Sequence, residues 1–132
     1  MGYENSCIYL IYSKNSKRGY VGSTIQGLQK RLGKHEVDYK GYWGLLNQPR
    51  NYRSSFEIFE DGEYDIYLLE SYPCECRSDL EKREQEWLYK VKTDIEITNK
   101  KKASRNTMMP FAPMIYTEEV TNLLNFWLFL II

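Results

Sequence analysis

The sequence predicts an α+β domain built on a small, mainly antiparallel sheet of three strands flanked by helices. Three short runs of strand-forming residues occur, at positions 8–12, 20–23 and 64–71, and one polar loop separates the first two, which predicts a hairpin. Between and after these runs, apolar residues recur at helical spacing. A chain of 132 residues with 42% hydrophobic content suits a single compact domain.

The three strands are distinguished by their apolar patterns. Residues 8–12 are apolar on both alternating faces, which is typical of a strand covered on both sides. The polar stretch 13–19 ends in glycine, and residues 20–23 resume the apolar run as the second strand of the hairpin. Residues 64–71, "YDIYLLES", alternate after an Asp-Gly turn signal, and Pro73 ends this third strand.

A first helix is expected directly after the hairpin. Ser23 and Gln26 match the spacing of a capping box, which predicts a helix from about Thr24 to Val37. Residues 38–53, "DYKGYWGLLNQPRNYR", mix glycine and proline with basic and aromatic residues, so we expect a long, partly helical connection there.

Two further helices are predicted in the second half of the chain. Residues 80–91 carry an apolar stripe, with Ser78 or Asp79 as the cap. Thr117 can cap a last helix whose apolar end, "FWLFLII", is far shorter than the roughly 20 residues that cross a bilayer. We therefore expect no membrane span, and interpret this end as a surface for a protein partner or a homo-oligomer, a packed tail or an aggregation-prone end.

The net charge of zero hides an uneven distribution. Residues 1–54 hold nine Lys/Arg and three Asp/Glu, a balance of +6, whereas residues 55–98 hold five and thirteen, a balance of −8. A basic half can attract a polyanion, although charge runs are often only solvated faces. Lys40, Arg50 and Arg53 are candidates for phosphate contacts in a DNA groove, beside aromatic rings that either stack on bases or pack the helical layer.

The cysteines and the N-terminus indicate an intracellular protein. Cys74-Glu75-Cys76 is spaced too closely for the usual CxxC half of a zinc site, and the chain has one histidine, so structural zinc is not expected. Reduced thiols fit an intracellular compartment better. The stretch "MGYENSCIYL" has no basic region followed by an apolar core, so no secretory signal is predicted.

Glu84 is the most informative residue of the sequence. It lies four residues from both Leu80 and Leu88, inside the apolar stripe of the predicted helix 80–91. A buried carboxylate is costly unless it is paired, hydrogen-bonded or bound to a metal. The alternatives are a carboxylate that reaches the rim of the core, or a salt bridge to an arginine.

Arg31 and His35 form a second candidate pair, four residues apart on the first predicted helix. Both can point back at the hairpin, which carries Tyr9 and Tyr20, or they can form the solvated edge of the helix. Tyrosines, a cation and a lone carboxylate that converge on one pocket have the parts that a phosphodiester hydrolase needs.

The order and spacing of these residues resemble the GIY-YIG endonuclease family. Cys7-Ile8-Tyr9 and Tyr20-Val21-Gly22 stand in place of the two triplets, "LQKRLGKHE" is similar to the first helix, and "LEKREQEWLYKV" is similar to the helix with the metal-binding glutamate. The resemblance spans roughly residues 6–105, and "NKKKAS" resembles stand-alone members from large DNA viruses and phages. We therefore expect a nuclease domain at 1–105 and an apolar, helix-patterned extension at 106–132, in the host cytoplasm or nucleus if the protein is viral.

The resemblance implies a metal-dependent DNA endonuclease or nickase. Glu84 would bind a single Mg²⁺, or Mn²⁺ in its place, and Arg31 would stabilise the charge of the transition state. Tyr9, helped by His35 or a lysine, would activate or position the attacking water, and Tyr20 would orient the phosphate or that water. Asn99 is the family's downstream asparagine, with a structural hydrogen bond to backbone as the alternative. The rival interpretation is a catalytically silent DNA-binding or protein-interaction module on the same fold.

Overall fold

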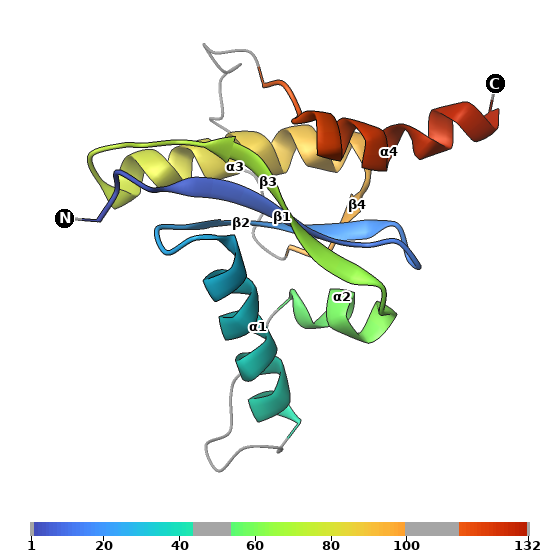
Figure 1. The fold of residues 1–132 in the computed structure, drawn as a ribbon, viewed down its shortest axis with the longest axis horizontal. Helices are drawn as coiled ribbons and strands as arrows, with labels where there is room; N and C mark the ends of the chain where they lie inside the picture. The colour runs from blue at the N-terminus through green and yellow to red at the C-terminus, as the bar shows by residue number, and fades with distance from the viewer. Residues whose placement is uncertain (1, 44–53, 100–113, 132) are drawn as a thin grey trace.

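A mixed sheet of four strands lies between two pairs of helices (Figure 1). The computed structural model describes residues 2–43, 54–99 and 114–131, with side chains as far as 124. The strands are β1 (Cys7–Ser13), β2 (Arg18–Thr24), β3 (Tyr64–Ser71) and β4 (Glu96–Ile97). The helices are α1 (Leu28–Tyr42), α2 (Phe56–Asp61), α3 (Arg77–Asp94) and α4 (Glu118–Ile131).

The strand order is β3-β1-β2-β4, with β1 antiparallel to both β2 and β3. The antiparallel arrangement of the three predicted strands is confirmed, but the predicted number of strands is wrong. The fourth strand, β4, pairs in parallel with the start of β2, Arg18 with Glu96 and Gly19 with Ile97. Two residues are too few for an alternating pattern, so tertiary pairing alone defines this strand.

Strand β1 is buried along its whole length, as its apolar pattern predicts. On one face, Ile8, Leu10 and Tyr12 pack in a core cluster with residues of α3 and α4. On the other face, Tyr9 and Ile11 pack with residues of α1 and α2. Figure 1 shows these helix pairs on opposite sides of the sheet.

Helix α1 begins later and ends later than the sequence predicts. Ser23 and Thr24 are the last residues of β2, and Gly27 precedes the helix with a φ of 90° and no side-chain cap. The predicted capping box is therefore wrong. Gly27 makes the turn in a conformation that glycine adopts at little cost, and the Ser23 hydroxyl is left for another contact.

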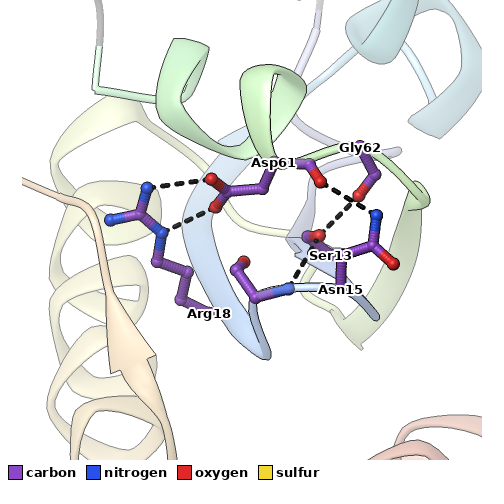
Figure 2. A network of polar contacts seen from close by, with 6 residues as sticks. Ser13, Asn15, Arg18, Asp61 and Gly62 are labelled. Carbon is purple, nitrogen blue, oxygen red and sulfur yellow. Dashed lines mark hydrogen bonds and ion pairs between the residues drawn. The ribbon is translucent and has the colours of Figure 1, made fainter.

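Helix α2 is too short for a sequence periodicity and was not predicted. Its apolar residues Phe56, Ile58 and Phe59 are buried against the sheet. Its C-terminal end is tied to the β1–β2 hairpin: Arg18 donates two hydrogen bonds to Asp61, at 2.6 and 3.1 Å, and Ser13 donates one to the Gly62 carbonyl (Figure 2). The hairpin thus fixes where α2 lies.

Helices α3 and α4 cover the other face of the sheet. Helix α3 extends beyond the predicted 80–91 at both ends, and the predicted cap of α4 is confirmed, since the Thr117 hydroxyl accepts a hydrogen bond from the Val120 N–H. Val120 is fully buried in the core cluster that lies between the sheet and helices α3 and α4. Within the described ranges, no helix is both long and apolar enough to cross a membrane. The partner or oligomer surface at the end of α4 stays a prediction.

Candidate active site

A polar cleft of about 560 Å³ opens beside β2 and is lined by residues of α1, β2 and α3. One wall comes from α1, through Arg31 and Lys34, and the other from α3, through Arg77, Glu81 and Glu84. The remaining residues that line it include Tyr20, Ser23, Ser54 and Asn99. The cleft therefore brings together four of the six predicted catalytic residues: Tyr20, Arg31, Glu84 and Asn99.

The other two, Tyr9 and His35, are buried directly behind the α1 wall. The Tyr9 hydroxyl lies 2.8 Å from His35 Nε2 and accepts a hydrogen bond from Arg31 Nε over 3.1 Å. Tyr9 is 0% exposed and His35 is 1% exposed, so the alternative of a solvated helix edge does not hold for His35. Because Arg31 also lines the cleft, its side chain lies between the Tyr9 phenol and the open cleft.

The surroundings of Tyr9 keep it in the neutral phenol form. Burial raises the pKa of the Tyr9 phenol, and the neighbouring Tyr20 raises it further, whereas the charge and hydrogen bond of Arg31 lower it. The net effect is a raised pKa, since the loss of hydration outweighs one cation. A phenolate poised at neutral pH, which an independent base would require, is therefore not what this site favours.

Gly22 leaves the space that Tyr9 occupies. The two residues are paired across β1 and β2, and a Cβ placed on Gly22 would lie only 2.3 Å from the Tyr9 hydroxyl oxygen. The ring thus passes over the glycine to reach Arg31 and His35. This explains the last position of the Tyr20-Val21-Gly22 triplet by close packing.

Tyr20 approaches the same histidine from the neighbouring strand. Its ring lies edge-on to His35, with 5.5 Å between the ring centroids, and it lines the cleft. His35 is therefore enclosed by rings from β1 and β2, and by Phe59 of α2 at 6.4 Å.

Glu84 is partly buried on the opposite wall of the cleft. The Ser23 hydroxyl donates a hydrogen bond to its Oε1 over 2.7 Å. This is the hydroxyl that the capping-box interpretation assigned to the helix start. The carboxylate therefore reaches the rim of the apolar core, which is one of the alternatives that the sequence left open, and it faces the cleft from there.

Asn99 joins the edge of β2 through its side chain. Its Oδ1 accepts a hydrogen bond from the Val21 N–H at 3.0 Å, and its Nδ2 donates to the Val21 carbonyl at 2.9 Å. The amide thus substitutes for a neighbouring strand beyond the end of β4. This is the backbone role that the sequence analysis gave as the alternative, and it places Asn99 in the cleft as well.

The oxygen donors of the cleft suit a hard cation. Glu84 supplies a carboxylate and Ser23 a hydroxyl next to it. In the described part of the chain, no group of three or more His, Cys, Asp or Glu residues is arranged to bind a metal. The donor set fits Mg²⁺, which is commonly held by one or two carboxylates and keeps several waters.

The predicted DNA contacts lie apart from these residues or outside the described ranges. Lys40 is exposed in the last turn of α1, two helical turns or more from Arg31. Arg50 and Arg53 fall among residues 44–53, outside the part of the chain that the structure describes. Lys34 and Arg77, which do line the cleft, were not among the predicted residues.

Sequence reasoning also missed a buried arginine on α3. Arg83 is 4% exposed and donates hydrogen bonds to Glu70 of β3, at 2.6 and 3.1 Å, and to Glu86 at 2.6 Å. Trp87 Nε1 donates to the same Glu70 carboxylate. The arginine beside Glu84 is thus part of the contact between α3 and the sheet.

Comparisons with known proteins agree with this geometry. The family model for the GIY-YIG catalytic domain matches residues 5–102. The solved structure of the catalytic domain of the homing endonuclease I-TevI is similar in fold, with a TM-score of 0.56 and 23% identity, over 74% of this chain and 99% of that one. No curated protein sequence matches the chain. The chain therefore belongs to the GIY-YIG family and holds that family's nuclease catalytic domain over most of its length.

Proposed function

We propose that this protein is a DNA endonuclease or nickase that hydrolyses phosphodiester bonds with the help of a single divalent ion. One observation carries the proposal: Glu84 and Arg31 face the same cleft from opposite walls, with the Tyr9–His35 pair behind Arg31. A carboxylate for a cation, a guanidinium for a phosphate and a proton acceptor for water are then within one site.

Glu84 is the residue that would hold the ion, Mg²⁺ or Mn²⁺, with Ser23 fixing the carboxylate by its hydrogen bond. When bound, such an ion polarises a phosphoryl oxygen and stabilises the negative charge that develops on it. The role of the protein at this wall is to present one oriented carboxylate in an otherwise wet, polar cleft.

Arg31 and Tyr9 would act in sequence on the α1 wall. A DNA phosphate in the cleft attracts the Arg31 guanidinium, which binds phosphate oxygens strongly and in a defined geometry. Movement of Arg31 toward the phosphate opens the Tyr9 hydroxyl to the attacking water. Tyr9 then takes a proton from that water as its own proton passes to His35 Nε2, 2.8 Å away. A new P–O bond forms, the P–O bond to the leaving group breaks, and the leaving oxygen takes a proton from solvent.

DNA is the substrate class that we propose. The GIY-YIG fold is shared with the catalytic domain of a homing endonuclease, and Lys34 of α1 adds positive charge on the wall that carries Arg31, whereas Arg77 on the α3 wall is paired with Glu81. Lys40, Arg50 and Arg53 remain candidates for phosphate contacts further along the strand, and Asn99 remains a candidate catalytic residue. We also propose an intracellular site of action, in the host cytoplasm or nucleus if the protein is viral.

The test is a plasmid assay with purified full-length protein. Supercoiled DNA incubated with Mg²⁺ or Mn²⁺ should be converted to the open-circular or linear form, and a chelator should stop the conversion. An RNA of similar length serves as the comparison substrate. DNA binding without cleavage under every metal condition would contradict the nuclease and favour the catalytically silent binding module.

A further inference from the structure

Ser55 lies on the far side of His35 from Tyr9. Its Oγ is 2.9 Å from His35 Nδ1, while His35 Nε2 is 2.8 Å from the Tyr9 hydroxyl. Ser55 is 0% exposed, so water does not compete for this contact. The three side chains form a continuous chain of polar contacts through the imidazole, from α2 to β1.

Ser55 does not use its hydroxyl as a helix cap, although it holds the N-cap position of α2. Serine is among the preferred residues at that position because its oxygen usually accepts a hydrogen bond from the first turn. Here the backbone of Ser55 is helical, with φ −66° and ψ −20°, and no side-chain cap bond forms. The hydroxyl faces His35 instead.

The imidazole must be in one particular tautomer to take a proton from Tyr9. Nε2 has to be unprotonated, which places the ring proton on Nδ1, and an acceptor at Nδ1 favours that form. The Tyr9 oxygen already accepts a hydrogen bond from Arg31 Nε, so its own O–H is available to donate to Nε2. Ser55 Oγ lies where it can accept the Nδ1–H.

We propose that Ser55 is a positioning residue that holds His35 in the Nδ1–H tautomer, so that Nε2 can accept the Tyr9 proton. The role in cleavage rests on the proposed nuclease function. The proton moves from Tyr9 Oη to His35 Nε2, and the resulting imidazolium keeps a hydrogen bond at each nitrogen, to Tyr9 and to Ser55.

Helix α2 supplies this serine and is itself fixed in place. Phe56, Ile58 and Phe59 are buried in the core cluster on the face of the sheet that α1 and α2 cover. Asp61, at the other end of α2, accepts both hydrogen bonds from Arg18. The hairpin that carries Tyr9 and Tyr20 therefore also sets the position of Ser55. This gives a function to a six-residue helix that no periodicity in the sequence predicts.

The tautomer can be observed directly because the chain has a single histidine. Labelling the full-length protein with ¹⁵N-histidine yields one pair of imidazole signals, and long-range proton–nitrogen correlations assign the proton to Nδ1 or Nε2. We expect Nδ1–H in the wild type and in Ser55→Thr, and a loss of that preference in Ser55→Ala. Ser6→Ala is the matched control, since it removes the hydroxyl of another buried serine, whose hydrogen bond goes to the Tyr3 carbonyl rather than to α2 or His35.

The same variants are then compared in the plasmid assay. For histidines that bind a metal, the partner that fixes the tautomer and orientation typically contributes roughly 10- to 100-fold. Taking the same scale for His35, we expect kcat of Ser55→Ala to fall by about that factor, with KM for DNA little changed. Ser55→Thr should restore most of the rate, and Ser6→Ala should retain it.

An Nε2–H tautomer in the wild type, or an unchanged tautomer and kcat in Ser55→Ala, would overturn the assignment of Ser55. Absence of nicking by the wild type would overturn the proposed function instead, because the ¹⁵N spectra decide the role of Ser55 toward His35 without DNA.

Discussion

The two faces of β1 carry buried tyrosines in very different surroundings. Tyr9 points toward α1, where its hydroxyl contacts Arg31 and His35 beside the cleft. Tyr12, three residues later, points to the opposite face and packs in the cluster that includes Leu10, Val91 and Val120. Both are at most 2% exposed, and burial raises the phenol pKa of both.

Residue type and burial therefore do not separate a functional tyrosine from a packing one in this protein. The difference lies in which helices face each side of the strand. Helix α1 brings a cation and an imidazole to its face, whereas α3 and α4 bring mainly apolar side chains to theirs. Because successive side chains of a strand point to opposite faces of the sheet, a tyrosine beside the cleft and a tyrosine in the core can lie only three residues apart.

Substitution of each tyrosine by phenylalanine is the strongest way to break this comparison. Tyr9→Phe removes the proton acceptor for water and should lower the nicking rate by roughly 100-fold or more, the usual range for a general acid–base group. Tyr12→Phe keeps the ring in the core and should stay within about twofold of the wild-type rate, since no step involves its hydroxyl. Plasmid-nicking kinetics give both numbers, and equal losses in the two variants would contradict the division between the faces.

Removing the space for the Tyr9 ring should have the next largest effect. In Gly22→Ala the new methyl group would overlap the Tyr9 hydroxyl, so the phenol must shift. We expect a loss of about 1–3 kcal/mol in the free energy of unfolding, as for other overpacked sites, together with a nicking rate clearly below wild type.

Gly33→Ala on α1 is the control for this change. A Cβ at Gly33 has no neighbour within 4 Å, so the variant should gain about 0.5–1 kcal/mol from helix propensity and keep its activity. Urea unfolding and nicking rates measure both. A Gly22→Ala variant as stable and active as Gly33→Ala would show that Tyr9 does not need the glycine.

Loss of the Arg18–Asp61 ion pair, which joins the hairpin to α2, should have the smallest effect. It should be visible in the pH dependence of the free energy of unfolding. The hydrogen bonds from Arg18 hold the pKa of Asp61 below its usual value. The carboxylate therefore stabilises the fold at neutral pH, and this stabilisation is lost as the pH falls below about 4, because the native state must then take up a proton. The pair is partly exposed, at 26% and 18%, so we expect about 1 kcal/mol or less.

Asp61→Asn is the variant that reveals this contribution. The difference in free energy of unfolding between wild type and variant should be largest near pH 6 and shrink toward pH 3, as measured by urea unfolding. Glu81→Gln is the control, in a pair with Arg77 that is much more exposed, and should change the free energy of unfolding less, because exposed ion pairs contribute little. A difference for Asp61→Asn that stays constant with pH would contradict the role of the Arg18 ion pair.

Local patterns were enough to predict much of the fold. The run of strand-forming residues in β3, the double-sided burial of β1 and the cap of α4 are each encoded within a few consecutive residues, and all agree with the structure. The apolar stripe of α3 also identified Glu84 as a carboxylate among apolar residues. The strands β1 and β2 and the helix α1 then bring Tyr9, Tyr20, Arg31 and His35 together, as the sequence spacing suggested.

Contacts between distant residues could not be predicted in the same way. Ser23 and Glu84 are 61 positions apart, and Val21 and Asn99 are 78 apart. Ser23 matched a local cap pattern, but its hydroxyl donates a hydrogen bond to Glu84 in the folded protein. Gly27, not Ser23, precedes helix α1 and makes the turn into it. Ser55 gave no signal at all, because a six-residue helix has no periodicity and the hydroxyl acts on a histidine from another helix.

Glu84→Gln beside Glu81→Gln tests the central claim most directly. Both glutamates line the cleft from α3, but only Glu84 is oriented by Ser23, whereas Glu81 pairs with Arg77 at the surface. We expect Mg²⁺-dependent nicking of supercoiled plasmid to fall by roughly 100-fold or more in Glu84→Gln, since the proposed ion would lose the carboxylate of Glu84, and to persist in Glu81→Gln. Undiminished nicking by Glu84→Gln would contradict the account.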